Sequence, residues 1–341
     1  MMSDIQPQTV RARELYGDFW FNSEPVPVSA LRGSVILIHF WDYTCASCIR
    51  SLPYIKEWRS KYEPYGLTVV GVHTPRFPFG QNPEEVEKAI RRFGIRYPVV
   101  MDNAGLIASN YDSRTWPTIF LVDKNGFVRY RKEGEGNYAS TEHAVQTLLY
   151  DAGVGESLPL PMEAIRDIDK VGAVCYRATP EIHAGYLRGS IGNVEGYSPE
   201  SVMRYADPGF YLDGRFYAVG DWMNGRESLR LEQSEGEEGQ IIMEYQAVEV
   251  GGVLRQEGKG KVEVDVRQDD RFLKSETRGD DVRVAADGRS FLVVGEPRLY
   301  NIVRNLEYGE HVLRLTARGG GLAVYSFAFL TAVIPELVSN N

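Results

Sequence analysis

Residues 35–48 read VILIHFWDYTCASC, an apolar run that passes through a short polar stretch into a Cys-x-x-Cys. The apolar run predicts a buried strand, and Leu52 and Ile55 recur at helical spacing after the second cysteine. The amino end of a helix offers unpaired N–H groups and positive potential, which favour a thiolate over a thiol. The arrangement predicts thiol-disulfide exchange, with Cys45 as the activated sulfur and Cys48 closing a reversible disulfide.

A Cys-x-x-Cys also occurs as half of a zinc site. This chain has three cysteines, and Cys175 lies far from the pair with no second pair or histidine cluster beside it. We therefore expect neither a metal nor another cofactor. A chance spacing of two structural cysteines is the remaining alternative.

Strands and helices alternate through the first half of the chain. Residues 66–72 are apolar, and a helix is expected from Pro83 to Phe93, with Asn82 as its N-cap and Gly94 as its stop. The turn at Asn125-Gly126 predicts a hairpin, and a further helix is expected over residues 140–152. Strand–helix–strand alternation of this kind predicts parallel crossovers in an α/β sheet.

Residues 12–152 resemble a thioredoxin-fold domain of the TlpA-like thiol-disulfide oxidoreductases. The resemblance rests on Phe40-Trp41, on the Cys-x-x-Cys, on Pro53 in the following helix and on Trp116-Pro117 before a strand. It implies that Pro117 follows a cis peptide bond and lies against the active disulfide. It also implies a groove for protein substrates, with contributions from Trp41, Ala46, Ser47 and Trp116.

Nearly the whole chain resembles the soluble C-terminal region of DipZ-type proteins. The matching stretches are residues 20–23, 71–75, 116–117 and 134–138. That region pairs a thioredoxin-like domain with a β-sandwich similar to a carbohydrate-binding module. The membrane-embedded electron-transfer domain of the family is not in this sequence, so the electron donor stays unknown.

His39 occupies the position at which thioredoxin has a buried aspartate that helps to deprotonate the second cysteine. Histidine titrates near neutral pH, which suggests that His39 assists Cys48 when Cys48 attacks a mixed disulfide. The alternative, which we favour, is a neutral core histidine satisfied by a hydrogen bond. Asp42, three residues before Cys45, is expected to oppose a very low pKa at that cysteine.

The second half of the chain has a different pattern. After Leu158-Pro159-Leu160-Pro161, short alternating strands such as residues 260–266 and 311–315 are separated by polar turns. We expect an all-β jelly-roll or sandwich domain. The expected organisation is a thioredoxin-like redox domain over residues 1–155, a linker over 156–174 and the β-sandwich over 175–341.

Aromatic residues are frequent in the second half, and exposed rings there can stack on sugars. Trp222 is the best single candidate for a carbohydrate site. A structural or protein-docking role for this domain is the interpretation that we favour, since most of these rings are expected in the core.

Composition narrows the classes of partner. The 341 residues are 43% hydrophobic, which suits two packed cores, and the net charge of −9 argues against nucleic-acid binding. No apolar run is long enough to span a membrane, and the amino end lacks the pattern of a signal peptide. The literal expectation is a cytoplasmic protein, with an extracytoplasmic location as the alternative if the chain is trimmed.

Two other functions compete with disulfide exchange. A thiol peroxidase also uses an activated cysteine, but it carries Thr or Ser three residues earlier, where this chain has Asp42. A non-enzymatic module that binds a glycan or a protein would use the thioredoxin fold only as a scaffold. The intact cysteine pair argues against that function.

Overall fold

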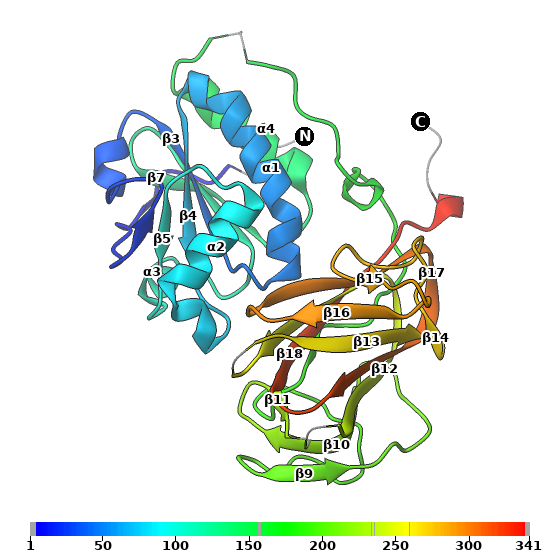
Figure 1. Ribbon diagram of the computed structural model, residues 1–341. Coiled ribbons are helices and arrows are strands. Elements are labelled where there is room, and N and C mark those ends of the chain that lie inside the picture. The colour runs from blue at the N-terminus through cyan, green and yellow to red at the C-terminus, as the bar shows by residue number, and fades with distance from the viewer. Residues whose placement is uncertain (1–4, 156–157, 233, 235, 259, 338–341) are drawn as a thin grey trace. The chain divides into compact units, whose positions relative to one another are not determined.

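The computed structural model describes residues 5–155, 158–232, 234, 236–258 and 260–337. The contacts of the chain divide it into two compact units, Met1–Val171 and Gly172–Asn341. Figure 1 shows that helices and strands alternate in the first unit and that the second consists almost entirely of strands. The division falls inside the segment 156–174 that the sequence assigns to a linker.

The first unit is built on a mixed sheet with the strand order β1-β7-β6-β3-β4-β5-β2. Its seven strands, among the described residues, are β1 (Val10–Arg11), β2 (Trp20–Phe21), β3 (Val35–Trp41), β4 (Leu67–His73), β5 (Val99–Met101), β6 (Thr118–Val122) and β7 (Phe127–Glu133). The central strand β3 pairs parallel with β4 and antiparallel with β6. Every residue of β3 is buried because both faces of the sheet are covered.

Four α-helices accompany this sheet in the part of the chain that the structure describes. They are α1 (Ala46–Tyr62), α2 (Pro83–Phe93), α3 (Leu106–Asn110) and α4 (Tyr138–Asp151). Short 3₁₀ helices occur at η1 (Val28–Leu31), η2 (Glu63–Tyr65), η3 (Pro78–Gln81), η4 (Asp167–Asp169) and, in the second unit, η5 (Pro335–Leu337). The predicted caps of α2 are confirmed, since the Asn82 side chain accepts from the Glu84 N–H and Gly94 is left-handed.

The helices cover both faces of the sheet. Tyr54 of α1 stacks on Tyr138 of α4 with ring centroids 3.7 Å apart, and Lys56 of α1 donates to the carbonyl of Phe93 of α2, so these three helices share a face. On the opposite face, α3 packs against alternate residues of β3, which include Ile38 and Phe40. The remaining positions of β3, among them His39 and Trp41, therefore face α1.

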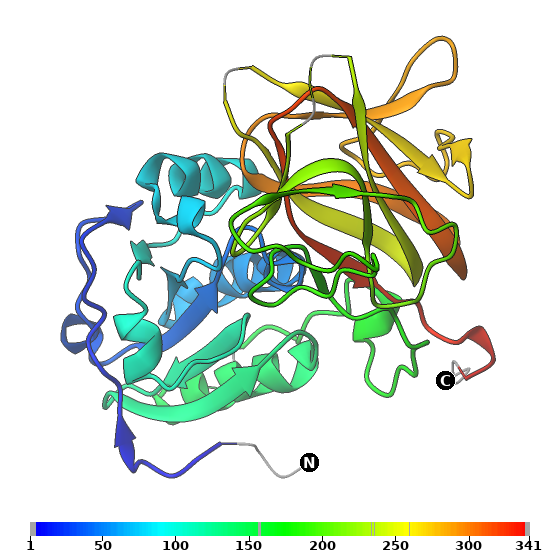
Figure 2. The same ribbon diagram turned by 90° about the horizontal axis from the view of Figure 1, so that it is seen from below.

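The second unit is a β-sandwich. Its strands in the described ranges are β8 (Ile182–His183), β9 (Val202–Tyr205), β10 (Tyr217–Asn224), β11 (Leu229–Leu231), β12 (Glu238–Gln256), β13 (Val262–Gln268), β14 (Arg271–Phe272), β15 (Arg283–Val284), β16 (Ser290–Val294), β17 (Arg298–Arg318) and β18 (Leu322–Leu330). The long strands β12 and β17 pair with each other on both sides of a register shift near Ala247. Before the shift β12 also pairs with β10, and after it with β18. Figure 2 shows that the strands of this unit are curved. Their buried apolar side chains form one core.

Trp222 belongs to that core. Its side chain has no exposed surface, and its indole N–H donates to the carbonyl of Val219 at 2.8 Å. Trp222 is therefore ruled out as the candidate for a carbohydrate site, because the ring presents no face to solvent. A large aromatic ring on an inward position of β10 contributes packing instead.

Candidate active site

Cys45 is the N-cap residue of α1. Its backbone is extended, at φ −81° and ψ 110°, and its sulfur accepts a hydrogen bond from the Cys48 N–H at 3.3 Å. The helix begins here because β3 ends at Trp41 and a three-residue turn follows, in which the Cys45 N–H donates to the Asp42 carbonyl. The sulfur thus lies at the positive end of the α1 dipole, as the sequence predicted.

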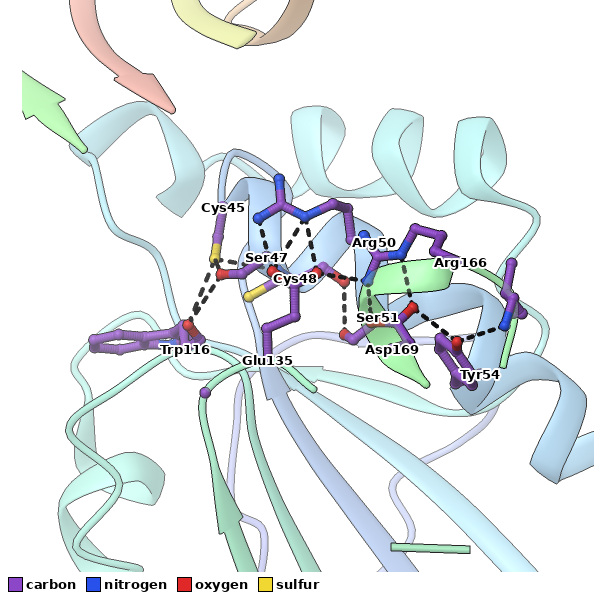
Figure 3. Close-up of polar contacts among 12 residues, drawn as sticks. Cys45, Ser47, Cys48, Arg50, Ser51, Tyr54, Trp116, Glu135, Arg166 and Asp169 are labelled. Carbon is purple, nitrogen blue, oxygen red and sulfur yellow. Dashed lines mark hydrogen bonds and ion pairs between the residues drawn. The ribbon is translucent and has the colours of Figure 1, made fainter. Parts of the chain in front are cut away.

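A second segment, 71 residues further along the chain, contacts Cys45. The carbonyl oxygen of Trp116 lies 3.8 Å from the Cys45 sulfur and accepts from the Ser47 hydroxyl at 3.3 Å, as Figure 3 shows. The Ser47 hydroxyl is itself 3.1 Å from the Cys45 sulfur. The Trp116–Pro117 bond is cis, as the resemblance implied. The fold therefore brings Cys45, Ser47, Cys48 and the Trp116-Pro117 pair together.

The two cysteines differ in their tendency to ionise, and both are free thiols. A hydrogen bond from the Cys48 thiol lowers the pKa of Cys45, and the Arg76 charge, the Ser47 hydroxyl and the Cys48 N–H lower it further against the effect of burial. Burial and the adjacent Cys45 sulfur raise the pKa of Cys48 well above its usual value. Cys45 is 4% exposed, whereas Cys48 has no exposed surface. The proton that the pair retains is therefore held on Cys48.

His39 and Trp41 lie beneath the dithiol and have no exposed surface. The His39 Nε2 atom lies 3.3 Å from the Ser51 hydroxyl, which donates to the Cys48 carbonyl, and burial lowers the pKa of His39 to about 3. The expectation that Trp41 lines the substrate groove is wrong, because its buried ring packs edge-on against His73. Ala46 is 9% exposed, and Ser47 and Trp116 are half-buried, so these residues lie at the rim.

Asp42 is a buried carboxylate beside the dithiol. One of its oxygens accepts from the Thr44 N–H at 2.7 Å and the other from the Arg76 N–H at 3.1 Å. Its Oδ2 atom also lies 3.5 Å from Nε2 of the buried His73. Burial alone would raise the pKa of Asp42, but His73, Thr44 and Arg76 together hold it below its usual value. Sequence reasoning noted the charge of Asp42 but missed these partners: Thr44 lies in the same turn, His73 ends β4, and Arg76 lies in the loop after β4.

A charged network links the linker to α1. Glu135 accepts from Arg50 at 2.7 Å and from Arg166 at 2.7 Å, and Arg166 also pairs with Asp169 at 2.8 Å (Figure 3). The Tyr54 hydroxyl donates to the same Asp169 at 2.8 Å. The polar residues after position 161 therefore pack on the first unit. The sequence did not indicate this packing, because the segment has the composition of a linker.

Neither a metal site nor a membrane helix emerges from the described residues. No group of three or more His, Cys, Asp or Glu side chains in those ranges is arranged to hold a metal ion. Across the same ranges, no helix combines the length and the apolar character that crossing a bilayer requires.

Comparisons with known families cover both units. Residues 18–131 match the AhpC/TSA family, and residues 179–329 match the family described as thioredoxin-like C-terminal domain. Protein DipZ of Mycobacterium tuberculosis is 35% identical over 237 residues, which are 68% of this chain and 33% of DipZ. The chain thus spans about a third of the length of this relative.

Shorter relatives match the first unit. Thiol-disulfide oxidoreductase YkuV of Bacillus subtilis is 28% identical over 137 residues, or 40% of this chain and 92% of YkuV. Among solved structures, the thioredoxin-like superfamily protein SPOA0173 is 26% identical, with a TM-score of 0.40 over 44% of this chain and all of that chain. The matches to both units and the similarity to DipZ and YkuV agree with the Cys-x-x-Cys at the start of α1, and they support the resemblance of the chain to the TlpA-like thiol-disulfide oxidoreductases.

Proposed function

We propose that this chain exchanges disulfides with protein substrates through Cys45 and Cys48. The observation that carries the proposal is the unequal pair at the start of α1. Cys45 has a lowered pKa and contacts a second segment of the domain, while Cys48 is fully buried with a raised pKa. A nucleophile and a resolving thiol need this difference.

The proposed reaction has two steps. The Cys45 thiolate attacks one sulfur of a substrate disulfide, so that a mixed disulfide forms and the other substrate sulfur leaves as a thiolate. Cys48 then loses its proton and attacks the Cys45 sulfur, which releases the second substrate sulfur and leaves a Cys45–Cys48 disulfide. Two electrons pass to the substrate, and the reverse sequence would oxidise a substrate dithiol. The direction depends on the reduction potential.

Trapping of the intermediate tests this proposal. A Cys48→Ser variant, reduced and mixed with a disulfide-containing protein such as insulin, should accumulate a mixed disulfide on Cys45. A Cys45→Ser variant should form none, and a Cys175→Ser variant should behave as the wild type. Equal trapping by the Cys45 variant, or none by the Cys48 variant, would overturn the assignment.

His39 is proposed to assist the resolving step. The Ser51 hydroxyl connects His39 to the Cys48 carbonyl, because it lies 3.3 Å from the His39 Nε2 atom and donates to that carbonyl. The low pKa of His39 makes it a weak proton acceptor. A His39→Asn variant should resolve the mixed disulfide more slowly than the wild type. An unchanged rate and pH profile would leave His39 as a neutral core residue.

Peroxidase activity is the second candidate, favoured by the match to the AhpC/TSA family over residues 18–131. Asp42 replaces the hydroxyl residue that supports the peroxidatic cysteine, which makes this candidate the weaker one. Consumption of hydrogen peroxide at a rate comparable to disulfide exchange would reverse that order.

For the second unit we propose a docking role toward a protein partner or a glycan. The proposal is supported by its β-sandwich fold and its match to the thioredoxin-like C-terminal domain family. Binding of the full chain to a glycan array tests the glycan arm. Absence of glycan binding would leave protein docking.

A further inference from the structure

The carboxylate of Asp42 joins the two loops that frame Cys45. Its Oδ1 atom accepts from the backbone N–H of Thr44 at 2.7 Å and also from the Thr44 hydroxyl. Its Oδ2 atom accepts from the backbone N–H of Arg76, in the loop that follows β4, at 3.1 Å. One side chain thus fixes the turn that leads into α1 and the loop that carries Arg76.

Asp42 is 1% exposed, and burying a charge costs free energy unless it is well paired. The titratable and charged groups around it come from three directions. His73 faces the carboxylate from the end of β4, and Arg76 faces it from the following loop. On the side of α1, the Cys48 sulfur accepts from the backbone N–H of Asp42. The described hydrogen bonds satisfy both carboxylate oxygens.

The charges of Asp42 and Arg76 act in opposite directions on the dithiol. The Asp42 charge disfavours a thiolate at Cys48, whereas the Arg76 charge favours a thiolate at Cys45. A carboxylate that acted on Cys45 only through its own field would oppose ionisation there. Support that Asp42 gives to the Cys45 thiolate must therefore act through position, either of the turn before Cys45 or of Arg76, and of these two Arg76 carries the positive charge.

We propose that Asp42 is a positioning residue of the redox site, which anchors the backbone of Arg76 so that the Arg76 guanidinium stabilises the thiolate form of Cys45. The inference rests on the proposed function in one respect, since it takes Cys45 as the attacking sulfur. It adds two residues beyond the dithiol, each with its own role. Arg76 supplies the positive charge, and Asp42 holds the backbone of Arg76 in position.

The charge of Arg76 is tested by alkylation of Cys45 over a pH series. The reduced full chain is treated briefly with iodoacetamide, and modification of the Cys45 peptide is quantified by mass spectrometry. Arg76→Gln keeps the backbone N–H that Asp42 binds and should move the alkylation midpoint to higher pH by about half a unit or more. Arg76→Lys keeps the positive charge, so its alkylation midpoint should lie close to the wild-type value. Arg96→Gln is the matched control: it removes an exposed arginine that precedes β5, at the opposite end of the parallel pair β4–β5 from Arg76.

The position of Arg76 is tested by the sign of a second shift. If Asp42 acted as a charge alone, Asp42→Asn would lower the midpoint, because a negative charge is removed. If it positions Arg76, Asp42→Asn should raise the midpoint, and adding Arg76→Gln should raise it little further. Asp42→Glu serves if the Asn variant does not fold: it keeps the charge and displaces the acceptor, so the proposal again requires a higher midpoint.

A lowered midpoint in Asp42→Asn, or an unchanged midpoint in Arg76→Gln, would overturn the inference. Alkylation needs no substrate, so its outcome is separate from the proposed function. If the midpoints shift as expected but no mixed disulfide is trapped, the proposed function is rejected and the positioning of Arg76 still stands. Trapping with unchanged midpoints would do the reverse.

Discussion

The Cys45 sulfur lies 3.8 Å from the carbonyl oxygen of Trp116, although 71 residues separate them in the chain. The contact forms because β3 and β6 are paired neighbours in the sheet, so the loop before β6 meets the loop after β3. Ser47 bridges the two, with its hydroxyl near both the sulfur and the carbonyl. The rim of the site is thus made from both halves of the first unit.

Removal of the Ser47 hydroxyl should make Cys45 less acidic. Ser47 is one of the groups that lower the pKa of Cys45, and loss of one hydrogen bond of about 0.5–1 kcal/mol corresponds to about a two- to five-fold smaller thiolate fraction. Ser47→Ala should therefore react more slowly with iodoacetamide near neutral pH. Ser60→Ala, exposed on the same helix, is the control, and an equal rate in both variants would contradict this contribution.

Burial of His39 should make the protein less stable in mild acid. The pKa of His39 falls from 6.5 to about 3 on folding, so the unfolded chain binds a proton below pH 6.5 that the folded chain does not. This contribution to stability is complete above pH 6.5 and is lost as the pH falls, by about 2 kcal/mol at pH 5.

Urea unfolding at pH 7.5 and pH 5 measures this dependence. His39→Asn should lose less stability between the two pH values than the wild type does, whatever its stability at pH 7.5. An identical loss in the two proteins would show that His39 is protonated equally in the folded and unfolded states.

The network around Glu135 should stabilise the first unit. Arg50 and Arg166 hold the pKa of Glu135 below its usual value against burial, and all three side chains are about four-fifths covered. Glu135→Gln leaves two partly buried arginines without their shared partner and should cost about 1–3 kcal/mol. Glu87→Gln, in an exposed pair with Arg91, should cost under about 0.5 kcal/mol.

The cost of Glu135→Gln should depend on pH in a defined sense. Because the pKa of Glu135 is lower in the folded protein, its contribution is present above the unfolded pKa of about 4.3 and is lost as the pH falls through the folded value. Denaturant unfolding at pH 7 and pH 3.5 should show the difference between variant and wild type shrinking in acid. A difference independent of pH would rule out the ion pairs as its source.

The core position of Trp222 predicts a large effect on the second unit. Trp222→Ala removes a fully buried ring and should cost about 3–5 kcal/mol. Phe210→Ala, at a position 61% exposed in the same unit, should change stability by under about 0.5 kcal/mol. Thermal unfolding of the full chain should show these changes in the transition of the second unit, and similar transitions for both variants would contradict the assignment of Trp222 to the core.

Local signals in the sequence predicted most of the first unit. The apolar run of β3, the cysteine at the start of α1 and the caps at Asn82 and Gly94 each depend on nearby residues, so periodicity and capping rules identify them. The approach of Trp116 to Cys45 followed from a resemblance, since no local rule pairs positions so distant.

Features that depend on long-range packing were not predictable in this way. Trp41 was expected to line the substrate groove and Trp222 was the candidate for a sugar site, but side-chain direction within a strand does not say which face is covered when both are apolar. The docking of Arg166 on Glu135 was missed because the segment after Pro161 has the composition of a linker and gains its partners only in three dimensions. The contact between Asp42 and the loop after β4 escaped notice for the same reason.

The reversible oxidation of Cys45 and Cys48 tests the central claim most directly. The full chain is equilibrated with glutathione buffers of graded potential, and the fraction with a Cys45–Cys48 disulfide is measured by mass spectrometry after acid quenching. A two-electron transition is expected between about −270 mV, typical of thioredoxin, and about −120 mV, typical of a strong oxidant. Failure to form any reversible disulfide between these cysteines would contradict the account.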